Sequence, residues 1–132
     1  MSSATDVSVA AGVHAAIAAY AQALDTGRTD DLVELFCPGG TSEVDGAGTF
    51  EGREAIRAAY AAWHPVKPQR HIVGNTVITS WDGDDATAIS DLAFFQRGAA
   101  GWAVPLVGRY EDTLHRHDGV WRFRRRVTTF RP

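Results

Sequence analysis

The N-terminal part of the chain has apolar residues at helical spacing. Between Ser8 and Leu24 they recur every three or four positions, which puts them on one face of an amphipathic helix. Thr26-Gly27 is a helix-ending signal directly afterwards. The residues on the apolar face are Val9, Val13, Ile17, Tyr20 and Leu24.

A second, shorter helix is expected next. Thr29 or Asp30 can cap its first turn, and Pro38-Gly39-Gly40 terminates it. Its apolar residues are Leu32, Leu35 and Phe36.

A short strand, a loop and a third helix complete the first half. Residues 41–44 have the pattern of a strand, and Asp45-Gly46-Ala47-Gly48 has that of a loop. From Glu51 to Trp63 helical spacing returns, and the helix ends before Pro65.

Beyond Pro68 the pattern changes to β-branched and aromatic residues divided by turns. Asp118-Gly119 is a strong hairpin signal among these turns. Helices that come first and hairpin-connected strands that come last favour an α+β fold over a parallel βαβ sheet. The predicted strands are Arg70–Ser80, Ala86–Gln96, Val104–His115 and Val120–Phe130.

The organisation predicted is a single domain over residues 1–132, because no repeat or linker divides the chain. The strands Ala86–Gln96 and Val104–His115 carry apolar residues toward both sheet faces, more than one pocket can cover. We therefore expect the outer face to be an interface in a homodimer or homotrimer.

Composition and charge exclude several partners. The formal charge is −3, from 13 basic and 16 acidic residues, so neither nucleic acid nor a membrane surface is an expected partner. Cys37 is the only cysteine, and no internal disulfide can form. No signal-peptide pattern opens the chain, and no window approaches the apolar length of a membrane span. A cytoplasmic, soluble protein is expected.

Cofactor motifs are not found either. The glycines between positions 39 and 52 lack the phosphate-binding patterns, and the histidines are not spaced as metal ligands. The chemistry expected is cofactor-free, with no metal.

Several short strings occur in a characteristic order and spacing: Tyr20-Ala-Gln-Ala-Leu-Asp25-Thr-Gly, Phe50-Glu-Gly-Arg-Glu-Ala-Ile-Arg57, Arg70-His71-Ile-Val-Gly-Asn75, Gly108-Arg-Tyr110-Glu-Asp112 and Asp118-Gly-Val-Trp-Arg-Phe123. Over Val13 to Phe130 the chain resembles the nuclear transport factor 2-like superfamily, particularly its SnoaL-like branch. The resemblance implies a cone-shaped α+β barrel, with N-terminal helices packed on a curved antiparallel sheet around one pocket. Members include scytalone dehydratase, ketosteroid isomerase, a dehydrochlorinase, polyketide cyclases and non-catalytic binding modules, so fold transfers better than function.

Asp25 and His71 form the first candidate catalytic pair. Asp25 ends the first predicted helix, while His71 begins a strand and shares its face with Asn75. A carboxylate that holds one ring nitrogen stabilises the imidazolium and leaves the other nitrogen free to take a proton. The resemblance implies catalytic Asp and His residues at these two positions. Alternatively, Asp25 only terminates the helix and His71 is a satisfied core histidine.

Tyr20, Asp45 and Glu111 form a second constellation, which the resemblance aligns with the oxyanion tyrosine, base and protonated acid of ketosteroid isomerase. Tyr20 lies about one and a half turns before Asp25, so it can point into the same cavity. Asp45 is also a plain Asp-Gly turn residue. Arg126 could bind an anionic group at the pocket mouth, and Trp63 could line the pocket or belong to the core.

The leading hypothesis is a small-molecule lyase or isomerase, of the dehydratase or polyketide cyclase type in secondary metabolism. His71 would move a proton, Asp25 would orient it, and Tyr20 and Asn75 would position an oxygen of a small apolar or ring-shaped ligand. The rival hypothesis is a non-catalytic ligand-binding or subunit-assembly module with the same fold.

Overall fold

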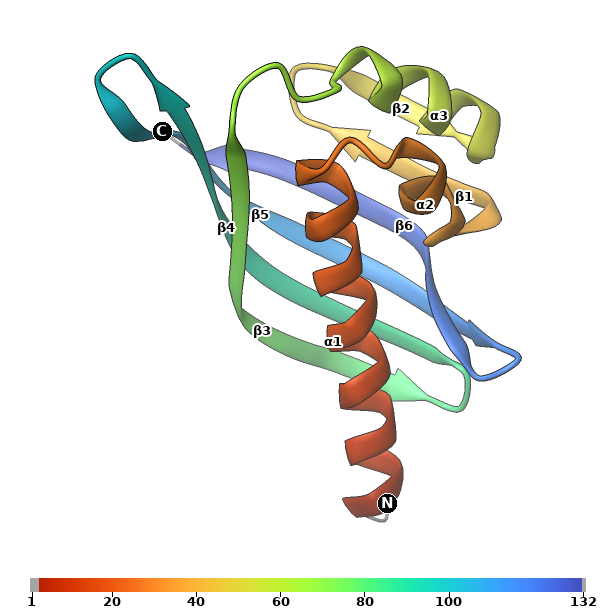
Figure 1. Ribbon diagram of the computed structural model, residues 1–132. Helices are drawn as coiled ribbons and strands as arrows, with labels where there is room; N and C mark the ends of the chain where they lie inside the picture. Colours follow the sequence, from red (N-terminus) through yellow and green to blue (C-terminus); the bar gives the residue numbers. More distant parts are fainter. Residues whose placement is uncertain (1–2, 132) are drawn as a thin grey trace.

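Three helices lie on one face of a curved, open, six-stranded sheet (Figure 1). The computed structural model describes residues 3–131. In chain order the elements are α1 (Ser3–Asp25), α2 (Thr29–Glu34), β1 (Phe36–Val44), β2 (Gly48–Glu51), α3 (Gly52–Ala62), β3 (Gln69–Asp82), β4 (Asp85–Gly98), β5 (Gly101–His117) and β6 (Val120–Arg131).

The strands are arranged in the order β2-β1-β6-β5-β4-β3. All neighbours are antiparallel except β1 and β6, which run parallel. The predicted α+β class and helix-on-sheet architecture are therefore confirmed, whereas the purely antiparallel sheet was wrong. The chain between α2 and α3 supplies the parallel strand β1, whose residues 41–44 were predicted as a strand. It also supplies the short edge strand β2, which lies between the predicted loop ending at Gly48 and the predicted helix starting at Glu51.

Phe36 shows why the boundary of the second helix was misplaced. It was expected on the helix, but α2 ends at Glu34 and Phe36 opens β1 with its ring fully buried. Pro38-Gly39-Gly40 does not end a helix; it forms the irregular part of β1, where the register against β6 shifts. Gly40 fits there because a Cβ would lie 2.9 Å from the carbonyl oxygens of Cys37 and Phe123.

Helix α1 buries its apolar stripe against the sheet, as its periodicity predicts. Gly12 allows the close approach, since a Cβ at this position would collide with the Trp121 indole. The expectation that no segment is long and apolar enough to span a membrane was wrong for Val7–Asp25, which meets that criterion by length and composition alone. A buried core helix meets the same criterion, and the buried side of α1 includes Val13 and Ile17.

Irregularities in the ladders bend the long strands. The register shifts between Gly74 and Val77 of β3, which has an extra residue relative to β4, and opposite Thr113 and Leu114 of β5, where β6 has the extra residue Arg124. An inserted residue increases local twist and changes which side chains face the helices. The sheet consequently curls around α1 and leaves a cavity near the C-terminal end of that helix.

Candidate functional site

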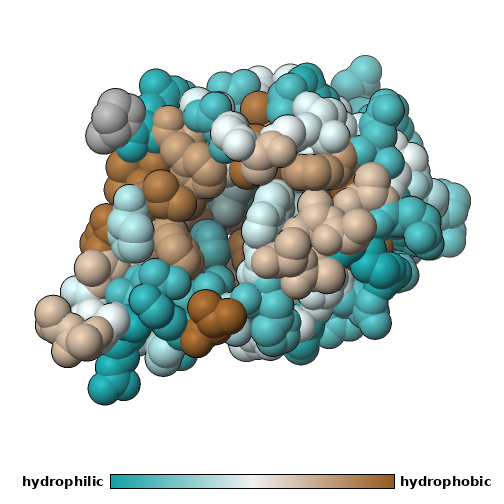
Figure 2. All heavy atoms as spheres, turned by 90° about the horizontal axis from the view of Figure 1, so that it is seen from above, coloured by the Kyte–Doolittle hydropathy of each residue, from teal (hydrophilic) through white to brown (hydrophobic). Residues whose placement is uncertain are grey.

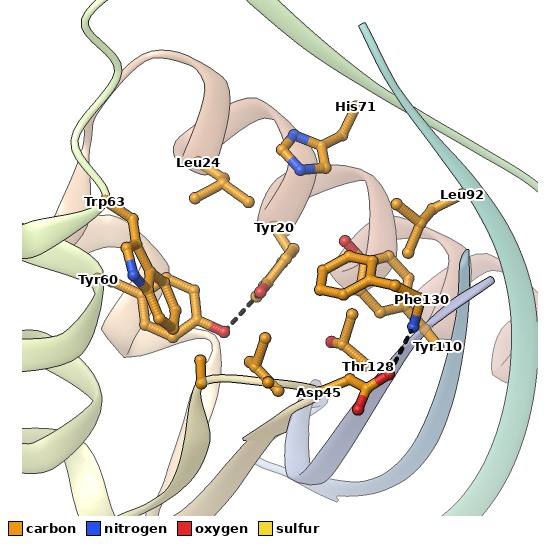
Figure 3. Close-up of a pocket in the computed structure, with 13 residues that line it drawn as sticks. Tyr20, Leu24, Asp45, Tyr60, Trp63, His71, Leu92, Tyr110, Thr128 and Phe130 are labelled. Carbon is orange, nitrogen blue, oxygen red and sulfur yellow. Dashed lines mark hydrogen bonds between the residues drawn. The ribbon is translucent and has the colours of Figure 1, made fainter. Parts of the chain in front are cut away.

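The cavity lies between the end of α1, the end of α3 and the concave face of the sheet (Figure 3). Its volume is about 330 Å³, at the small end of the range for ligand pockets. Seen from above, the molecular surface is hollowed between apolar side chains (Figure 2). The residues that line the cavity are Tyr20, Leu24, Val44, Asp45, Gly46, Ala47, Tyr60, Trp63, His71, Leu92, Tyr110, Thr128 and Phe130.

Asp25 and His71 are in direct contact at the edge of this cavity. The ring nitrogen Nδ1 of His71 lies 2.6 Å from one carboxylate oxygen of Asp25, and the backbone amide of His71 donates to the other oxygen at 2.6 Å. The Gln69 side-chain amide donates a third hydrogen bond at 3.1 Å. The end of α1 and the start of β3 are thereby joined through one carboxylate.

The environment of Asp25 favours its charged form. Its side chain is only 7% exposed, and burial alone would raise its pKa. The hydrogen bonds from the His71 ring and backbone, the charge of His71 and the Gln69 amide outweigh burial, and the pKa of Asp25 is lowered. A carboxylate in this state accepts a hydrogen bond from Nδ1 of His71 and so fixes the tautomer of the ring.

The His71 ring is positioned on its other sides as well. It lies against the Phe94 ring, with 4.8 Å between the ring centroids, and its side chain is 13% exposed. The ring points into the cavity in Figure 3. Within residues 3–131, Nδ1 is the ring nitrogen that makes a hydrogen bond, which leaves Nε2 available to a ligand.

Tyr20 and Tyr60 place hydroxyl groups on the opposite side of the cavity. Their oxygens are 2.6 Å apart, and the Tyr60 oxygen is 2.7 Å from the buried Ser42 hydroxyl. Tyr20, Tyr60 and Ser42 together have three hydroxyl protons, and the two hydrogen bonds between them use two. One proton therefore remains for another acceptor. Burial, reinforced by the neighbouring tyrosines, raises the pKa of Tyr20 well above its ordinary value, and burial also raises that of Tyr60. Both phenols therefore remain donors.

Tyr110 and Thr128 contribute two more hydroxyls from the sheet. They are direct partners across β5 and β6, both are buried, and both line the cavity. The Thr128 hydroxyl has no hydrogen-bond partner among the described residues. Nor do those residues provide a hydrogen bond to Tyr110, whose pKa burial raises far above its ordinary range.

Arg126 was expected at the pocket mouth, but this was wrong. It lies buried behind the cavity wall. Its side chain is completely buried and forms two hydrogen bonds with Asp112, at 2.8 and 3.2 Å. Its guanidinium carbon lies 4.2 Å from the Tyr20 ring centroid and 3.5 Å from that of Tyr110. Burial opposes the charge on Arg126, but Asp112 and the tyrosines raise its pKa further above the ordinary value, so this cation is permanent.

Asn75 and Glu111 also lie outside the cavity. Asn75 sits in the β3 irregularity with φ +53°, is exposed, and donates to an Asp91 carboxylate oxygen at 3.0 Å. The inserted residue ended the alternation that linked Asn75 to the face of His71. Glu111 is exposed on the opposite sheet face from its neighbours Tyr110 and Asp112, because successive strand residues point to opposite faces.

Asp45 and Trp63 stand at the cavity mouth. Asp45 lies in the turn between β1 and β2, where its side chain accepts a hydrogen bond from the Phe130 amide at 3.3 Å. Trp63 is 37% exposed and meets the Tyr60 ring edge to face, with centroids 4.9 Å apart. Asp45 is therefore both a turn residue and a residue of the cavity lining.

Three site hydroxyls were missed at the sequence level, those of Tyr60, Tyr110 and Thr128. Tyr60 falls on the apolar face of a predicted helix, and strand alternation alone would have placed Tyr110 and Asp112 together. No local signal singles out Thr128. Among the described residues no cluster of three His, Cys, Asp or Glu side chains could hold a metal ion; the reactive groups that line the cavity are an imidazole, a mouth carboxylate and hydroxyls.

A family model described as the SnoaL-like domain matches residues 6–127. The chain belongs to the SnoaL-like domain family. This confirms the resemblance read from the sequence strings. No curated protein matches this SnoaL-like chain in sequence.

Solved structures agree with this assignment. A variant of Rv3472 from Mycobacterium tuberculosis, itself of unknown function, has a TM-score of 0.89 at 27% identity, over 99% of this chain and 77% of that one. A candidate scytalone dehydratase from Novosphingobium aromaticivorans has a TM-score of 0.88 at 20% identity, over 99% and 89%. The beta subunit of a candidate aromatic-ring-hydroxylating dioxygenase from the same species has 0.78 at 21%, over 92% and 88%. The last two, at 20% and 21% identity, show a shared fold alone.

Proposed function

We propose that this SnoaL-like protein is a lyase or isomerase that moves a proton on a neutral, ring-containing organic substrate. The observation that carries the proposal is the hydrogen-bonded pair of Asp25 and His71, whose ring opens into an apolar cavity rather than into solvent. An imidazole held in this way has one nitrogen committed to the carboxylate and the other facing whatever the cavity binds.

In this mechanism His71 is the base. Its Nε2 takes a proton from a carbon next to a substrate carbonyl, and the ring becomes an imidazolium while the electron pair moves onto the carbonyl oxygen. Asp25 stabilises the imidazolium and keeps the ring from turning. General-base catalysis of this kind typically contributes about 10²–10⁴-fold in rate.

Tyr20 is proposed to receive the carbonyl oxygen. Its hydroxyl is linked to those of Tyr60 and Ser42, and one proton of this chain is left for an outside acceptor. An enolate oxygen bears more negative charge than the ketone from which it forms, so this donor binds the transition state more tightly than the substrate.

The cavity also indicates the substrate class. Its walls include the side chains of Leu24, Leu92 and Phe130, and the nearest cation behind them, Arg126, is sealed beneath tyrosine rings. A carboxylate or phosphate would enter without a cation to pair with, and burying an unpaired charge in an apolar site is costly. A neutral ketone with one or two rings fits these walls better.

Hydrogen–deuterium exchange tests this proposal without knowledge of the natural substrate. The protein would be incubated in D₂O with β-tetralone and benzylacetone, and exchange next to the carbonyl followed by NMR. We expect His71→Ala to abolish the enzymatic exchange, whereas His14→Ala, at an exposed position on α1, should not change it. Equal exchange rates for His71→Ala and the unmodified chain would contradict the proposal.

The second candidate function is a non-catalytic binding or assembly module. It is favoured by the exposed apolar side chains Trp102, Val104, Leu106 and Val107 on the β4–β5 hairpin, and by the structural similarity to a protein described as a dioxygenase beta subunit. In that case the ketones would bind without any exchange, and the apolar hairpin would be the functional surface.

A further inference from the structure

Gln69 is a buried amide beside the Asp25–His71 pair, and the proposed proton transfer gives it no part. It is 7% exposed. It is the first residue of β3, the edge strand of the sheet along which α1 lies (Figure 1). Because alternate residues of a strand share a face, the side chains of Gln69 and His71 both turn toward the end of α1. One carboxylate can therefore contact both.

The two side chains share a single oxygen of Asp25. Its Oδ1 lies 2.6 Å from Nδ1 of His71 and accepts from Nε2 of Gln69 at 3.1 Å, while Oδ2 accepts from the His71 backbone amide. The nitrogen of the Gln69 amide must face Oδ1, because the amide oxygen would be repelled by the carboxylate. An oxygen with two donors binds a further proton less readily than an oxygen with one donor. Gln69 therefore weakens Oδ1 as a proton acceptor without breaking its contact with the ring.

The burial of Asp25 explains why this donor matters. Burial raises the pKa of Asp25, and the hydrogen bonds from His71 and Gln69 outweigh that effect and lower it. A ligand that fills the apolar cavity expels water and strengthens the effect of burial. The Gln69 amide belongs to the protein and stays in place when water leaves, so its stabilisation of the charged carboxylate does not depend on solvent.

We infer that Gln69 is a positioning residue that extends the activity of the Asp25–His71 pair to lower pH, by holding Oδ1 in its charged, proton-free form. The inference rests on the proposed function, in which the ring must be uncharged to take a proton from the substrate. Without the amide, Asp25 binds a proton more readily and also holds a protonated ring more strongly. Both effects add a proton to the pair, which titrates as a unit, and the activity is lost at a higher pH.

Other titratable or charged groups surround the pair. They are Tyr20 of α1, Tyr60 of α3, Arg70 of β3, Tyr110 of β5, Arg126 of β6, Asp45 of the β1–β2 turn and His64, whose ring packs on Gly27. Burial raises the pKa values of the three tyrosines, which stay neutral at acidic pH, and guanidinium groups keep their charge. Asp45 and His64 are the same in all chains compared below. A difference between those chains therefore reports on position 69.

Three substitutions isolate the amide. Gln69→Met removes the donor but keeps the length of the side chain, and Asp25 retains both hydrogen bonds from His71, so we expect the fold to persist. Gln69→Glu places a second carboxylate beside the first, and two carboxylates at one site bind a proton strongly. Gln96→Met is the matched control, since Gln96 is the register partner of Gln69 on β4. Among residues 3–131 its amide makes no hydrogen bond to either member of the pair.

The pH profile of hydrogen–deuterium exchange on benzylacetone tests the inference. At the acidic pH where the unmodified chain has half of its plateau rate, Gln69→Met should be about fivefold slower, because one hydrogen bond to a charged group corresponds to roughly one pH unit. Gln69→Glu should be slower still at that pH. Gln96→Met should follow the unmodified chain throughout. On the plateau, Gln69→Met should reach the rate of the unmodified chain.

Carbon-13 NMR gives a readout that needs no turnover. The Asp25 carboxyl resonance, assigned by its loss in Asp25→Asn, should titrate at higher pH in Gln69→Met than in the unmodified chain, because the charged carboxylate has lost a donor. The unmodified chain supplies a test that does not depend on the folding of any variant. Its Gln69 side-chain amide proton resonances should shift with the same midpoint as the Asp25 carboxyl, since the two groups are hydrogen-bonded.

Several results would overturn the inference. One is a Gln69→Met chain whose acid limb and carboxyl titration stay in place. Another is uniform loss of exchange at every pH, which would mean a structural role, and a third is an equal shift caused by Gln96→Met. Different midpoints for the Gln69 amide and the Asp25 carboxyl in the unmodified chain would also overturn it. Failure of the proposed function would look different, since His71→Ala would then retain exchange while the carboxyl titration still moved in Gln69→Met.

Discussion

The carboxylate of Asp25 holds His71 at two points, accepting from the ring with one oxygen and from the backbone amide with the other, each at 2.6 Å. The first contact sets the tautomer and the second fixes the strand that carries the ring. The orientation of the imidazole therefore does not depend on a bound ligand. A base that is already oriented needs no reorganisation when the proton moves.

His71→Ala should leave the fold intact. In this variant Asp25 keeps the hydrogen bonds from the position-71 backbone amide and from Gln69, so the carboxylate is not left unpaired. The loss is the contact of the partly buried ring with Phe94, and we expect the free energy of unfolding to fall by about 1–2 kcal/mol. Urea denaturation measures it. A loss well above this range would indicate that the histidine serves the core.

Asp25→Asn should reduce kcat strongly and change KM little, because the lost charge matters most when the imidazole becomes an imidazolium. It should also cost stability. The asparagine amide nitrogen must face either the His71 backbone amide or the donors at the other oxygen, and a buried donor without an acceptor costs about 1–3 kcal/mol. Retention of normal kcat across the pH range would reduce Asp25 to a helix-end residue.

The stability of the protein should depend on pH through Asp25. Because the folded-state pKa of Asp25 is lowered, the unfolded chain binds the proton more readily, and stability increases with pH in this window. The contribution is fully present above the unfolded pKa of about 3.9 and is lost as the pH falls through the folded value. Urea denaturation of the unmodified chain and Asp25→Asn should therefore give stabilities that converge at low pH. A difference that stays constant down to that range would contradict this.

The outcomes at individual residues show what the sequence could predict. The pairing of Asp25 with His71 was predicted from the family resemblance together with the positions of the two residues, at the end of a helix and near the start of a strand. The prediction that Asn75 shares the face of His71 was wrong, because one inserted residue in β3 changes the alternation. Nothing in the string Gly74-Asn75-Thr76 marks the position of a bulge.

The predictions that Glu111 and Arg126 bind a ligand in the cavity were wrong for other reasons. Glu111 was chosen from an aligned register, and an error of one residue moves a side chain to the other sheet face; Asp112 is the buried acid. Arg126 does face inward, but whether it reaches a ligand depends on the rings of Tyr20 and Tyr110, which come from distant parts of the chain. No local sequence pattern shows which rings will separate the Arg126 side chain from the cavity.

The buried ion pair of Arg126 and Asp112 gives a prediction on stability that does not require a substrate. Arg126→Met should cost about 3–5 kcal/mol, because it leaves the Asp112 carboxyl buried without a partner. The double variant Arg126→Met, Asp112→Leu should recover most of this loss, since it removes both charges. Guanidinium denaturation of the two variants decides the matter. A double variant as unstable as the single one would mean that the packing of the guanidinium between rings matters more than its charge.

The exposed apolar hairpin predicts self-association. Trp102 is 52% exposed and Leu106 40% exposed on strand β5, and Figure 1 places this hairpin beyond the helices, where they do not cover it. A second copy of the chain would bury the same residues on both subunits, so Leu106→Glu would introduce two charges into a homodimer and three into a homotrimer. We expect this variant to be monomeric in sedimentation velocity at micromolar concentration, where the unmodified chain should be a dimer or trimer. Val120→Glu is the matched control, since Val120 is 47% exposed at the start of β6, at the other end of β5 from the hairpin. It should leave the oligomer unchanged. An unmodified chain that sediments as a monomer would contradict the prediction, and so would dissociation caused equally by both substitutions.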